Sequence, residues 1–387
     1  MTDKQIRILV VDDTVVYRKI VSDIIAEQPD MEVVGIAANG RIALQKIQQL
    51  HPDLLTLDLE MPEIDGLGVL TELKKQTNPP GAIMLSAFTD AHATATINAL
   101  ELGAFDFVLK PSGSSLQQSK DALTNDLCSR IRMFARTRKL RNINKNIAGN
   151  TKSGSPYTTA TLTENTYNEA TQSTQSTQPA ISKMVFNAPP ANIEIIGLGI
   201  STGGPQSLTK MMPSLPGNLP VPLLIVQHMP PMFTKSLADD LDKKCAVSVC
   251  EAADGQPVES ACVYIAPGGK QMKIVKDNNQ TIIKITDDPP ENSCKPSVDY
   301  LFRSISLLYG AHTLGIVMTG MGNDGTLGCR LLKRKGARII LQDKDSCVVY
   351  GMPRQPAEEG LADIIAPLDK IADEITKLTS GKVVACR

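Results

Sequence analysis

The segment IRILVVDD, residues 6–13, is a short apolar run that ends in two aspartates. Its apolar residues follow one another without alternation, which is typical of a strand buried on both faces of a parallel sheet. Similar runs follow, separated by helical patterns such as Ala43, Leu44, Ile47 and Leu50. Together they predict a five-stranded parallel sheet with helices on both faces. The predicted strands are Ile6–Val11, Glu32–Ala37, Asp53–Leu59, Ala82–Ser86 and Phe105–Leu109.

The composition changes sharply from about residue 144 to residue 190, where Thr, Gln, Ser and Asn replace most apolar residues. Such a segment cannot bury enough apolar surface to offset the entropy of ordering it. We therefore predict a first domain over residues 1–125 and a second over residues 192–380. Residues 126–191 are predicted to be a helix extension, fading near Asn142, and a flexible polar linker.

The second domain again alternates buried strands with helices, which predicts a doubly wound, mainly parallel α/β domain. A β-hairpin joined through Asp277-Asn278-Asn279 is expected to interrupt the parallel pattern. The predicted elements are strands at Ile193–Ile200, Leu223–His228, Val247–Glu251, Val263–Ala266, Thr313–Thr319 and Arg338–Gln342, a hairpin at Gln271–Lys276 and Thr281–Thr286, and helices after Gly204, Pro231, Ser297 and Gly325.

The composition is that of a soluble globular protein, with 42% hydrophobic residues and a formal net charge of −1 over 387 residues. A chain without a strong field of either sign is not expected to bind nucleic acid or anionic membrane surfaces. We expect no signal peptide, and no membrane insertion, because no run of about 18 apolar residues is present.

The chain has eight cysteines, none of them in a CxxC pair or at zinc-site spacing from histidines. Most lie inside apolar runs, so we expect small buried hydrophobic side chains in a reducing compartment. This favours a cytoplasmic protein.

Polar residues gather at the predicted carboxyl ends of the strands in the first domain. Asp12 and Asp13 follow the first strand, and Asp58 lies near the end of the third. Those ends share one edge of a parallel sheet, where three carboxylates repel one another unless a hard cation joins them. Mg²⁺ is therefore the expected cofactor. Ser86 and Lys110 end the fourth and fifth strands and suit the oxygens of a phosphoryl group.

This arrangement resembles the receiver domain of two-component response regulators, a flavodoxin-like (βα)₅ fold, over residues 1–125. The resemblance implies that Asp58 is the phosphoacceptor. It also implies that Asp12, Asp13 and Asp58 hold the metal ion, with Glu60 contributing its backbone carbonyl.

The same resemblance implies that Ser86 and Lys110 contact the phosphoryl group. Phe107 occupies the position of the switch aromatic in that family, and a histidine kinase would be the phosphodonor. A cis bond before Pro111 is expected to fix the direction of Lys110.

The segment GISTGGP, residues 199–205, follows a predicted strand and opens a predicted helix. Ser201 is therefore expected on a tight turn at the sheet edge, as in nucleophile elbows. Thr202 belongs to the same turn, and backbone N–H groups at the start of the helix can stabilise an oxyanion. A glycine-rich turn of this kind can also cradle a phosphate, so both interpretations stay open on this segment alone.

Two further residues favour catalysis over phosphate binding. The next predicted strand ends in VQHMP, which places His228 at the same edge, and the chain has only four histidines. The segment TGMGNDG, residues 319–325, is another strand, turn and helix start, and it carries Asp324. Asp324 can cap that helix or orient the imidazole of a triad with Ser201. The chain order Ser, His, Asp differs from that of α/β-hydrolases.

The second domain resembles the catalytic domain of the CheB family of protein-glutamate methylesterases over residues 193–370. The resemblance implies a Ser201–His228–Asp324 triad, with Met321 helping to bind the oxyanion. It rests on the motifs GISTGGP, QHMP, EAADGQPV, VYIAPGG, KPSVDYLF, TGMGNDG and QDKDSCVVYGMP.

Members of that family hydrolyse glutamyl methyl esters on methyl-accepting chemotaxis receptors, and many deamidate receptor glutamines. The implied partners are these receptors and a chemotaxis histidine kinase, and ester hydrolysis needs no cofactor. We also expect the unphosphorylated receiver to cover the crevice of Ser201.

Four residues at three places depart from those that are usual in the family. Ile200 stands where Ala is usual, Gln271 where His is usual, and Cys294-Lys295 where His-Arg is usual. These departures fall near the expected substrate groove or domain interface and remove no proposed catalytic group.

Two alternatives stay open. One is a response regulator with a non-catalytic binding output, although the basic residues between Arg130 and Arg141 are better explained as the solvated end of a helix. The other is an esterase of the same mechanism in another two-component pathway.

Overall fold

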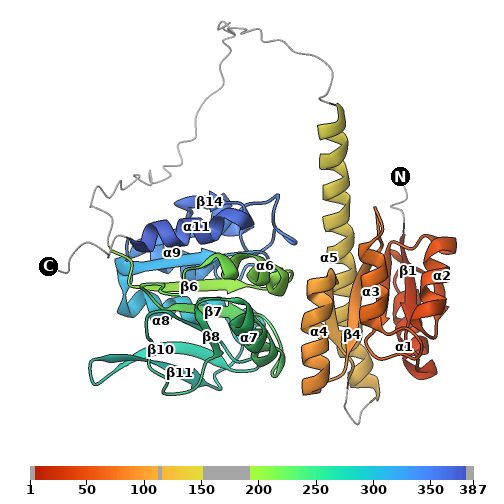
Figure 1. Ribbon diagram of the computed structural model, residues 1–387, viewed down its shortest axis with the longest axis horizontal. Helices are drawn as coiled ribbons and strands as arrows, with labels where there is room; N and C mark the ends of the chain where they lie inside the picture. The colour runs from red at the N-terminus through yellow and green to blue at the C-terminus, as the bar shows by residue number, and fades with distance from the viewer. Residues whose placement is uncertain (1–4, 112–115, 151–191, 381–387) are drawn as a thin grey trace, which may run out of the picture. The chain divides into compact units, whose positions relative to one another are not determined.

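The computed structural model describes residues 5–111, 116–150 and 192–380, with only the backbone described at 116–119 and 140–150 (Figure 1). The chain divides into a compact unit, residues 1–137 together with 191–387, and a second unit, residues 138–190. Most of the predicted linker lies outside the described residues.

Five parallel strands form the first sheet, in the order β2-β1-β3-β4-β5. All of β3 and the last four residues of β1 are buried, which explains why their sequences lack polar alternation. The elements are β1 Ile6–Val11, α1 Val15–Ala26, β2 Met31–Ala37, α2 Gly40–Leu50, β3 Leu54–Asp58, α3 Gly66–Lys74, β4 Gly81–Ser86, α4 Asp90–Leu102, β5 Asp106–Leu109 and α5 Leu116–Asn150.

Helix α5 is longer than the sequence predicts, since it runs to Asn150 rather than fading near Asn142. Its last two turns contain no proline, but they carry Asn144, Asn146 and Gly149, so helix propensity does not explain the extra length.

Seven parallel strands form the second sheet, in the order β14-β13-β12-β6-β7-β9-β8. Its elements are β6 Ile195–Ile200, α6 Gly204–Met211, η1 Met212–Ser214, β7 Leu223–Gln227, α7 Phe233–Lys244, β8 Ser248–Glu251, β9 Cys262–Ile265, α8 Val298–Leu308, η2 Gly310–His312, β12 Thr313–Val317, α9 Thr326–Arg334, β13 Arg338–Gln342, α10 Arg354–Glu358, β14 Ile364–Ala366 and α11 Leu368–Thr379.

The predicted hairpin is confirmed as a separate two-stranded antiparallel sheet, β10 Gln271–Asp277 and β11 Gln280–Thr286 (Figure 1). It packs on α8, where the backbone N–H of Ile274 donates to Ser304 Oγ at 3.1 Å. Asn278 and Asn279 both have positive φ, the left-handed conformation that a two-residue hairpin turn requires.

The predicted strands of both domains are confirmed to within two residues at either end. Strand β14 and helices α10 and α11 were not predicted. Because β14 has only three residues and lies at the sheet edge, it offers too few positions for a pattern.

The strand order creates one crevice in each sheet. The chain leaves β1 and β3 toward opposite edges of the first sheet, and it leaves β6 and β12 toward opposite edges of the second. Ligands of open α/β sheets bind outside the carboxyl ends of such strand pairs. Asp12 and Asp58 end one pair, and Ser201 and Thr319 follow the other.

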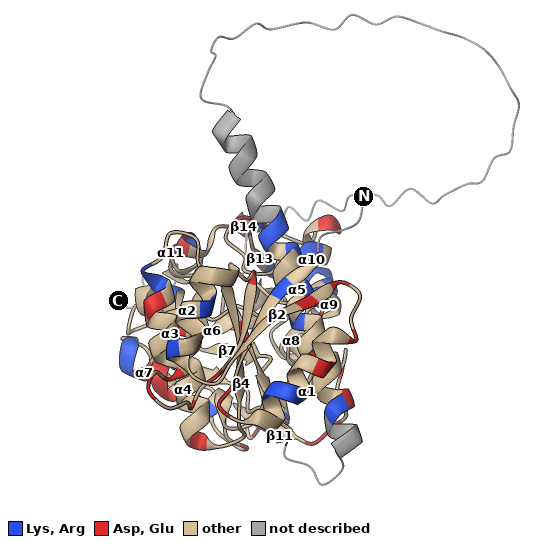
Figure 2. Cartoon of the chain, turned by 90° about the vertical axis from the view of Figure 1, so that its right-hand side faces the viewer, with Lys and Arg blue, Asp and Glu red and all other residues tan. Residues whose placement is uncertain are grey.

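Helices of the described ranges lack the combination of length and apolarity that a membrane crossing needs. Figure 2 shows basic and acidic residues mixed over the helices of the compact unit. Among the described residues the cis peptide bond is Lys295–Pro296, so the prediction of a cis bond before Pro111 is wrong. An X–Pro bond still favours trans by about 0.5–1 kcal/mol, and nothing in the sequence overrides that preference.

Candidate active site and phosphoacceptor site

The predicted acid cluster comes together at the carboxyl edge of the first sheet. Lys110 Nζ lies 2.8 Å from Asp12 Oδ2 and 2.7 Å from Asp58 Oδ2, and both carboxylates are buried. Asp13 is exposed, yet one of its oxygens lies within 4.8 Å of those of Asp12 and Asp58. The ammonium of Lys110 also lies 4.8 Å from the ring centroid of Tyr17.

Burial raises the pKa of Asp58 to about 6, against the hydrogen bond from Lys110, and the nearby charge of Asp12 adds to the rise. Burial lowers the pKa of Lys110, but its hydrogen bonds to the two carboxylates outweigh that and raise it. Asp12 Oδ2 has this ion pair but no hydrogen bond of good geometry. Three carboxylates whose charge Lys110 neutralises only in part fit a hard cation such as Mg²⁺.

The other predicted receiver residues surround this cluster. Ser86 is buried at the end of β4, and its Oγ accepts a 2.9 Å hydrogen bond from Thr96 Oγ1. Glu60 directs its side chain outward, where an oxygen lies 3.3 Å from His92 Nε2, so only its backbone is available to the cluster. Phe107 is buried, and its ring stacks on that of Phe233 in α7 with centroids 4.7 Å apart.

Ser201 lies directly after β6, on the turn that leads into α6. Its backbone N–H donates to Thr319 O at 2.9 Å, which ties the turn to the end of the neighbouring strand β12. Gly203 has φ 78, and a Cβ at Gly204 would lie 1.9 Å from Gln227 Oε1. The turn therefore needs glycine at both positions, as its sequence indicated.

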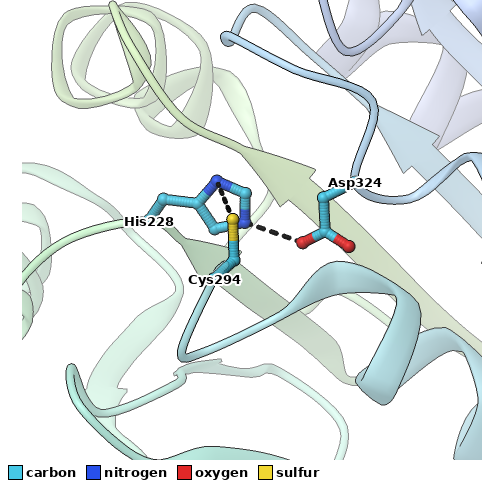
Figure 3. Close-up of side chains that lie close together, drawn as sticks. All are labelled: His228, Cys294 and Asp324. Atoms are coloured by element: carbon cyan, nitrogen blue, oxygen red, sulfur yellow. Dashed lines mark hydrogen bonds and ion pairs between the residues drawn. The ribbon is translucent and has the colours of Figure 1, made fainter. Parts of the chain in front are cut away.

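His228 and Asp324 meet at the same edge as Ser201. His228 Nε2 lies 2.8 Å from Asp324 Oδ2, and both residues follow strands that flank β6 (Figure 3). Burial lowers the pKa of His228, but its hydrogen bonds to Asp324 and Cys294 outweigh that and raise it to about 9. Asp324 thus stabilises the cationic imidazole.

Asp324 does not cap α9, the helix that follows it. The α9 N-cap is Gly325, which makes no side-chain cap bond, and the carboxylate of Asp324 instead accepts hydrogen bonds at the start of α8. Burial opposes its ionisation, but hydrogen bonds from His228 and from α8 lower the pKa of Asp324 to about 2. Its donors are Ser297 Oγ at 2.9 Å, Val298 N at 2.7 Å, Asp299 N at 3.1 Å, Asn292 Nδ2 at 3.1 Å and Gly325 N at 3.1 Å.

Sequence reasoning missed Cys294, which lies at the second nitrogen of the imidazole. Cys294 Sγ is 3.7 Å from His228 Nδ1 (Figure 3). No hydrogen bond joins Ser201 Oγ to His228 among the residues that the structure describes. The one signal in the sequence was that Cys294 replaces a residue usual in the family; a separation of 66 residues gave no other.

The remaining predicted residues line the mouth of the crevice. Thr202 is buried, and its Oγ1 donates to Asp106 Oδ2, at the start of β5, at 3.0 Å. Met321 is 39% exposed, and its sulfur lies 3.7 Å from Ser129 Oγ of α5. Arg130 holds Asp106 through an ion pair of 2.8 Å.

A cavity of about 320 Å³ lies between the turn that carries Ser201 and the first domain. It is lined on one side by Leu100, Asp106, Phe107, Leu109, Asp126 and Arg130, and on the other by Ser201, Thr202, Gly203, Pro205, Gln227, His228, Met229, Pro230, Ser293, Cys294 and Met321. Residues of the first domain therefore cover the crevice of Ser201.

Polar contacts extend this interface along α4, α6 and α7. Gln206 Nε2 donates to the backbone carbonyls of Leu100 and of Ala104, the latter at 2.8 Å. Glu101 accepts a 3.0 Å bond from Thr209 Oγ1 and pairs with Lys244.

Two family models match the chain: the response regulator receiver domain over residues 8–119 and CheB methylesterase over residues 196–375. A receiver followed by a methylesterase defines a response regulator with an enzymatic output. The "Protein-glutamate methylesterase/protein-glutamine glutaminase" of Desulfotalea psychrophila is 49% identical to this chain over 374 residues, covering 96% of it and 98% of the relative. The chain belongs to the CheB methylesterase family.

A second relative agrees. The protein of the same description from Trichodesmium erythraeum is 40% identical over 375 residues, which is 96% of this chain and 98% of the relative. The solved CheB methylesterase catalytic domain of Thermotoga maritima is 40% identical and covers 49% of this chain and 100% of its own, with a TM-score of 0.47.

The predicted fold class, the family and the class of enzyme are thereby confirmed. The chain is a carboxylic ester hydrolase regulated through a receiver domain, and a non-catalytic output is not favoured. The roles of individual residues stay predictions.

Proposed function

We propose that the chain hydrolyses methyl esters of glutamate side chains on chemotaxis receptors, with Ser201 as nucleophile and His228 and Asp324 as its partners. The observation that carries this proposal is the 2.8 Å bond between His228 and Asp324, at the sheet edge where Ser201 leaves β6. Nucleophile, base and orienting carboxylate on one edge are the requirements of acyl transfer through a serine.

In the first half of the reaction, which requires the neutral form of His228, Ser201 Oγ attacks the ester carbonyl and its proton passes to His228 Nδ1. Asp324, bound to Nε2, stabilises the resulting imidazolium. Backbone N–H groups of the turns that contain Thr202 and Met321 would hold the negative carbonyl oxygen. The imidazolium then returns its proton to the methoxy group, which leaves as methanol.

In the second half, water attacks the acyl-enzyme. One proton of the water passes to His228, which returns it to Ser201 Oγ as the ester bond to Ser201 breaks. The glutamic acid product then loses its proton to solvent and is released as a carboxylate. The same steps with a primary amide release ammonia, so we extend the proposal to deamidation of receptor glutamines.

Regulation is proposed to begin at Asp58, phosphorylated by the chemotaxis histidine kinase. Asp12, Asp13 and Asp58 would hold Mg²⁺, with the backbone carbonyl of Glu60 as a further oxygen ligand. When bound, Mg²⁺ neutralises charge on the transferring phosphoryl group. Lys110, already between the two buried carboxylates, is positioned to take a phosphoryl oxygen.

Ser86 Oγ would bind a second phosphoryl oxygen in exchange for its present contacts. A rearrangement there is expected to move Phe107, the switch aromatic, whose ring stacks on Phe233. Because the same domain covers the Ser201 crevice, we propose that phosphorylation weakens the docked state and opens the crevice.

We place the protein in the cytoplasm, together with the kinase and the receptor segments it acts on. The support is that the seven cysteines within the described ranges are free thiols, as a reducing compartment keeps them. An esterase role in another two-component pathway has no specific observation in its favour.

The test is methanol release from purified methylated receptors by the parent chain and by Ser201→Ala. We expect the substitution to lower the rate by about 10³-fold or more, by analogy with other triads. Ser260→Ala is a matched control, because Ser260 is exposed and its Oγ bonds only a loop carbonyl, that of Pro220. A Ser201→Ala rate within tenfold of the parent would overturn the assignment.

A further inference from the structure

Cys294 and His228 form a soft-donor pair inside the esterase crevice. The thiol sulfur lies 3.7 Å from Nδ1, the ring nitrogen that does not face Asp324 (Figure 3). Within the described residues, the groups of His, Cys, Asp and Glu that can hold a metal ion are this one, with Asp324, and the acid cluster of Asp12, Asp13 and Asp58.

We propose that Cys294 and His228 bind Zn²⁺, and that Zn²⁺ bound there inhibits the esterase by occupying the nitrogen that Ser201 needs as its base. The binding part of this proposal is independent of the proposed function, whereas the inhibition rests on it.

The first argument is the distance between the two donor atoms. A tetrahedral Zn²⁺ has Zn–S bonds of about 2.3 Å and Zn–N bonds of about 2.0–2.1 Å, so its sulfur and nitrogen ligands lie about 3.5 Å apart. The observed Sγ to Nδ1 distance of 3.7 Å is already close to that separation. A small closure of the Cys294 side chain brings both atoms to bonding distance of one ion.

The second argument is the role of Asp324. Histidines that bind metal ions usually donate their other ring N–H to a carboxylate, which fixes the tautomer and strengthens the ligand. Asp324 makes this bond to Nε2 at 2.8 Å. Its oxygens are already taken by hydrogen bonds from the start of α8, including Val298 N at 2.7 Å, so Asp324 supports the site rather than joining it as a ligand.

The third argument is the space beside the pair. The cavity of about 320 Å³ is lined by Cys294, His228 and Ser201 together, so the two remaining positions of the ion face open volume. Water or Ser201 Oγ can fill them. This leaves the coordination incomplete on the protein side, which predicts reversible binding rather than a structural zinc site.

The two groups of residues that can hold a metal ion are expected to prefer different cations. Thiolate and imidazole select Zn²⁺, whereas the carboxylate oxygens of the acid cluster suit Mg²⁺. On binding, Zn²⁺ loses two water ligands, Cys294 releases its thiol proton and the imidazolium its Nδ1 proton to solvent, and the ring keeps the proton on Nε2, toward Asp324. Mg²⁺ in excess should therefore leave the Cys294 site to Zn²⁺.

The binding experiment uses the full chain with Mg²⁺ in excess, so that oxygen sites are filled. Zn²⁺ affinity is measured by competition with a chromophoric chelator for the parent, Cys294→Ala, Cys294→Ser and Cys262→Ala. Cys262 is the matched control, because its partly buried thiol belongs to neither metal-capable group. Circular dichroism verifies that each variant is folded.

We expect both Cys294 variants to bind Zn²⁺ at least tenfold more weakly than the parent, with Cys262→Ala unchanged. Co²⁺ in place of Zn²⁺ should give a thiolate charge-transfer band in the parent that both Cys294 variants lose. Equal affinity in the parent and the Cys294 variants would overturn the site.

The inhibition experiment follows methanol release at increasing Zn²⁺, each variant being compared with its own rate in a chelator. The parent and Cys262→Ala should lose activity and recover it when the chelator is added, whereas the Cys294 variants should need at least tenfold more Zn²⁺. Binding through Cys294 without loss of methanol release would overturn the inhibition. If the Zn²⁺-free parent showed no Ser201-dependent release, the proposed function would fail while the binding result stood.

Discussion

The interface bonds of Gln206 offer a direct way to weaken receiver docking without touching a proposed catalytic group. Gln206 Nε2 donates to the carbonyls of Leu100 and Ala104, on the receiver side of the interface. Gln206→Leu keeps most of the side-chain volume and removes both bonds. A neutral hydrogen bond contributes about 0.5–1.5 kcal/mol net, so the docked state should lose about 1–3 kcal/mol.

A loss of about 2 kcal/mol shifts an equilibrium roughly 30-fold. If docking limits activity, unphosphorylated Gln206→Leu should be up to about 30-fold more active than the unphosphorylated parent, with the fully open rate as its ceiling. Its further stimulation by a phosphodonor should shrink by the same factor. The measurement is methanol release with and without a small-molecule phosphodonor and Mg²⁺.

Gln48→Leu is the matched control, because Gln48 is exposed on α2. It should leave both rates unchanged. An unphosphorylated rate of folded Gln206→Leu equal to that of the parent would refute the occlusion argument, and the receiver would then have to act by direct activation or by receptor targeting.

Three further predictions concern the proposed triad, the phosphoacceptor Asp58 and the turn that carries Ser201. His228→Gln and Asp324→Asn should each lower turnover severely, and combining either with Ser201→Ala should add little because the three act as a unit; losses that multiply in double mutants would argue against this. Asp58→Ala should give no response to phosphodonor and Mg²⁺, and a parent-like stimulation would exclude Asp58 as the acceptor. Gly204→Ala should cost about 1–3 kcal/mol of unfolding free energy in urea titration, because its Cβ meets a buried side chain at 1.9 Å; an unchanged midpoint would show that the turn relaxes.

The fold could be predicted from the sequence because each buried strand is a continuous apolar run bounded by polar or glycine residues. Such runs indicate parallel strands regardless of what packs on them. The predictions that were wrong or missing concern elements whose limits depend on small differences in local structural preference. Helix α5 continues to Asn150, beyond the end of its apolar pattern, and β14 is too short to show a pattern.

The two candidate sites could be located because the carboxyl ends of parallel strands share one edge of the sheet. Polar residues that follow such strands in the sequence are therefore expected in the same crevice. The partners of those residues could not be predicted in the same way. Cys294 and the donors at the start of α8 belong to a segment far from His228 and Asp324 in sequence. The sequence alone leaves open whether Asp324 caps α9 or faces the imidazole, because the choice depends on contacts with the start of α8.

The stacking of Phe107 on Phe233 bears on how phosphorylation of the receiver changes the rate of ester hydrolysis. Phe233 is the first residue of α7, only five positions after His228, and a short turn links them. The receiver therefore contacts the segment of chain that carries His228, the proposed general base. If phosphorylation displaces Phe107 as proposed, the movement should reach the imidazole as well as uncover the crevice, so phosphorylation would change the reactivity of the site as well as access to it. With a small ester that enters the docked enzyme freely, phosphorylation should change the hydrolysis rate only through its effect on the imidazole.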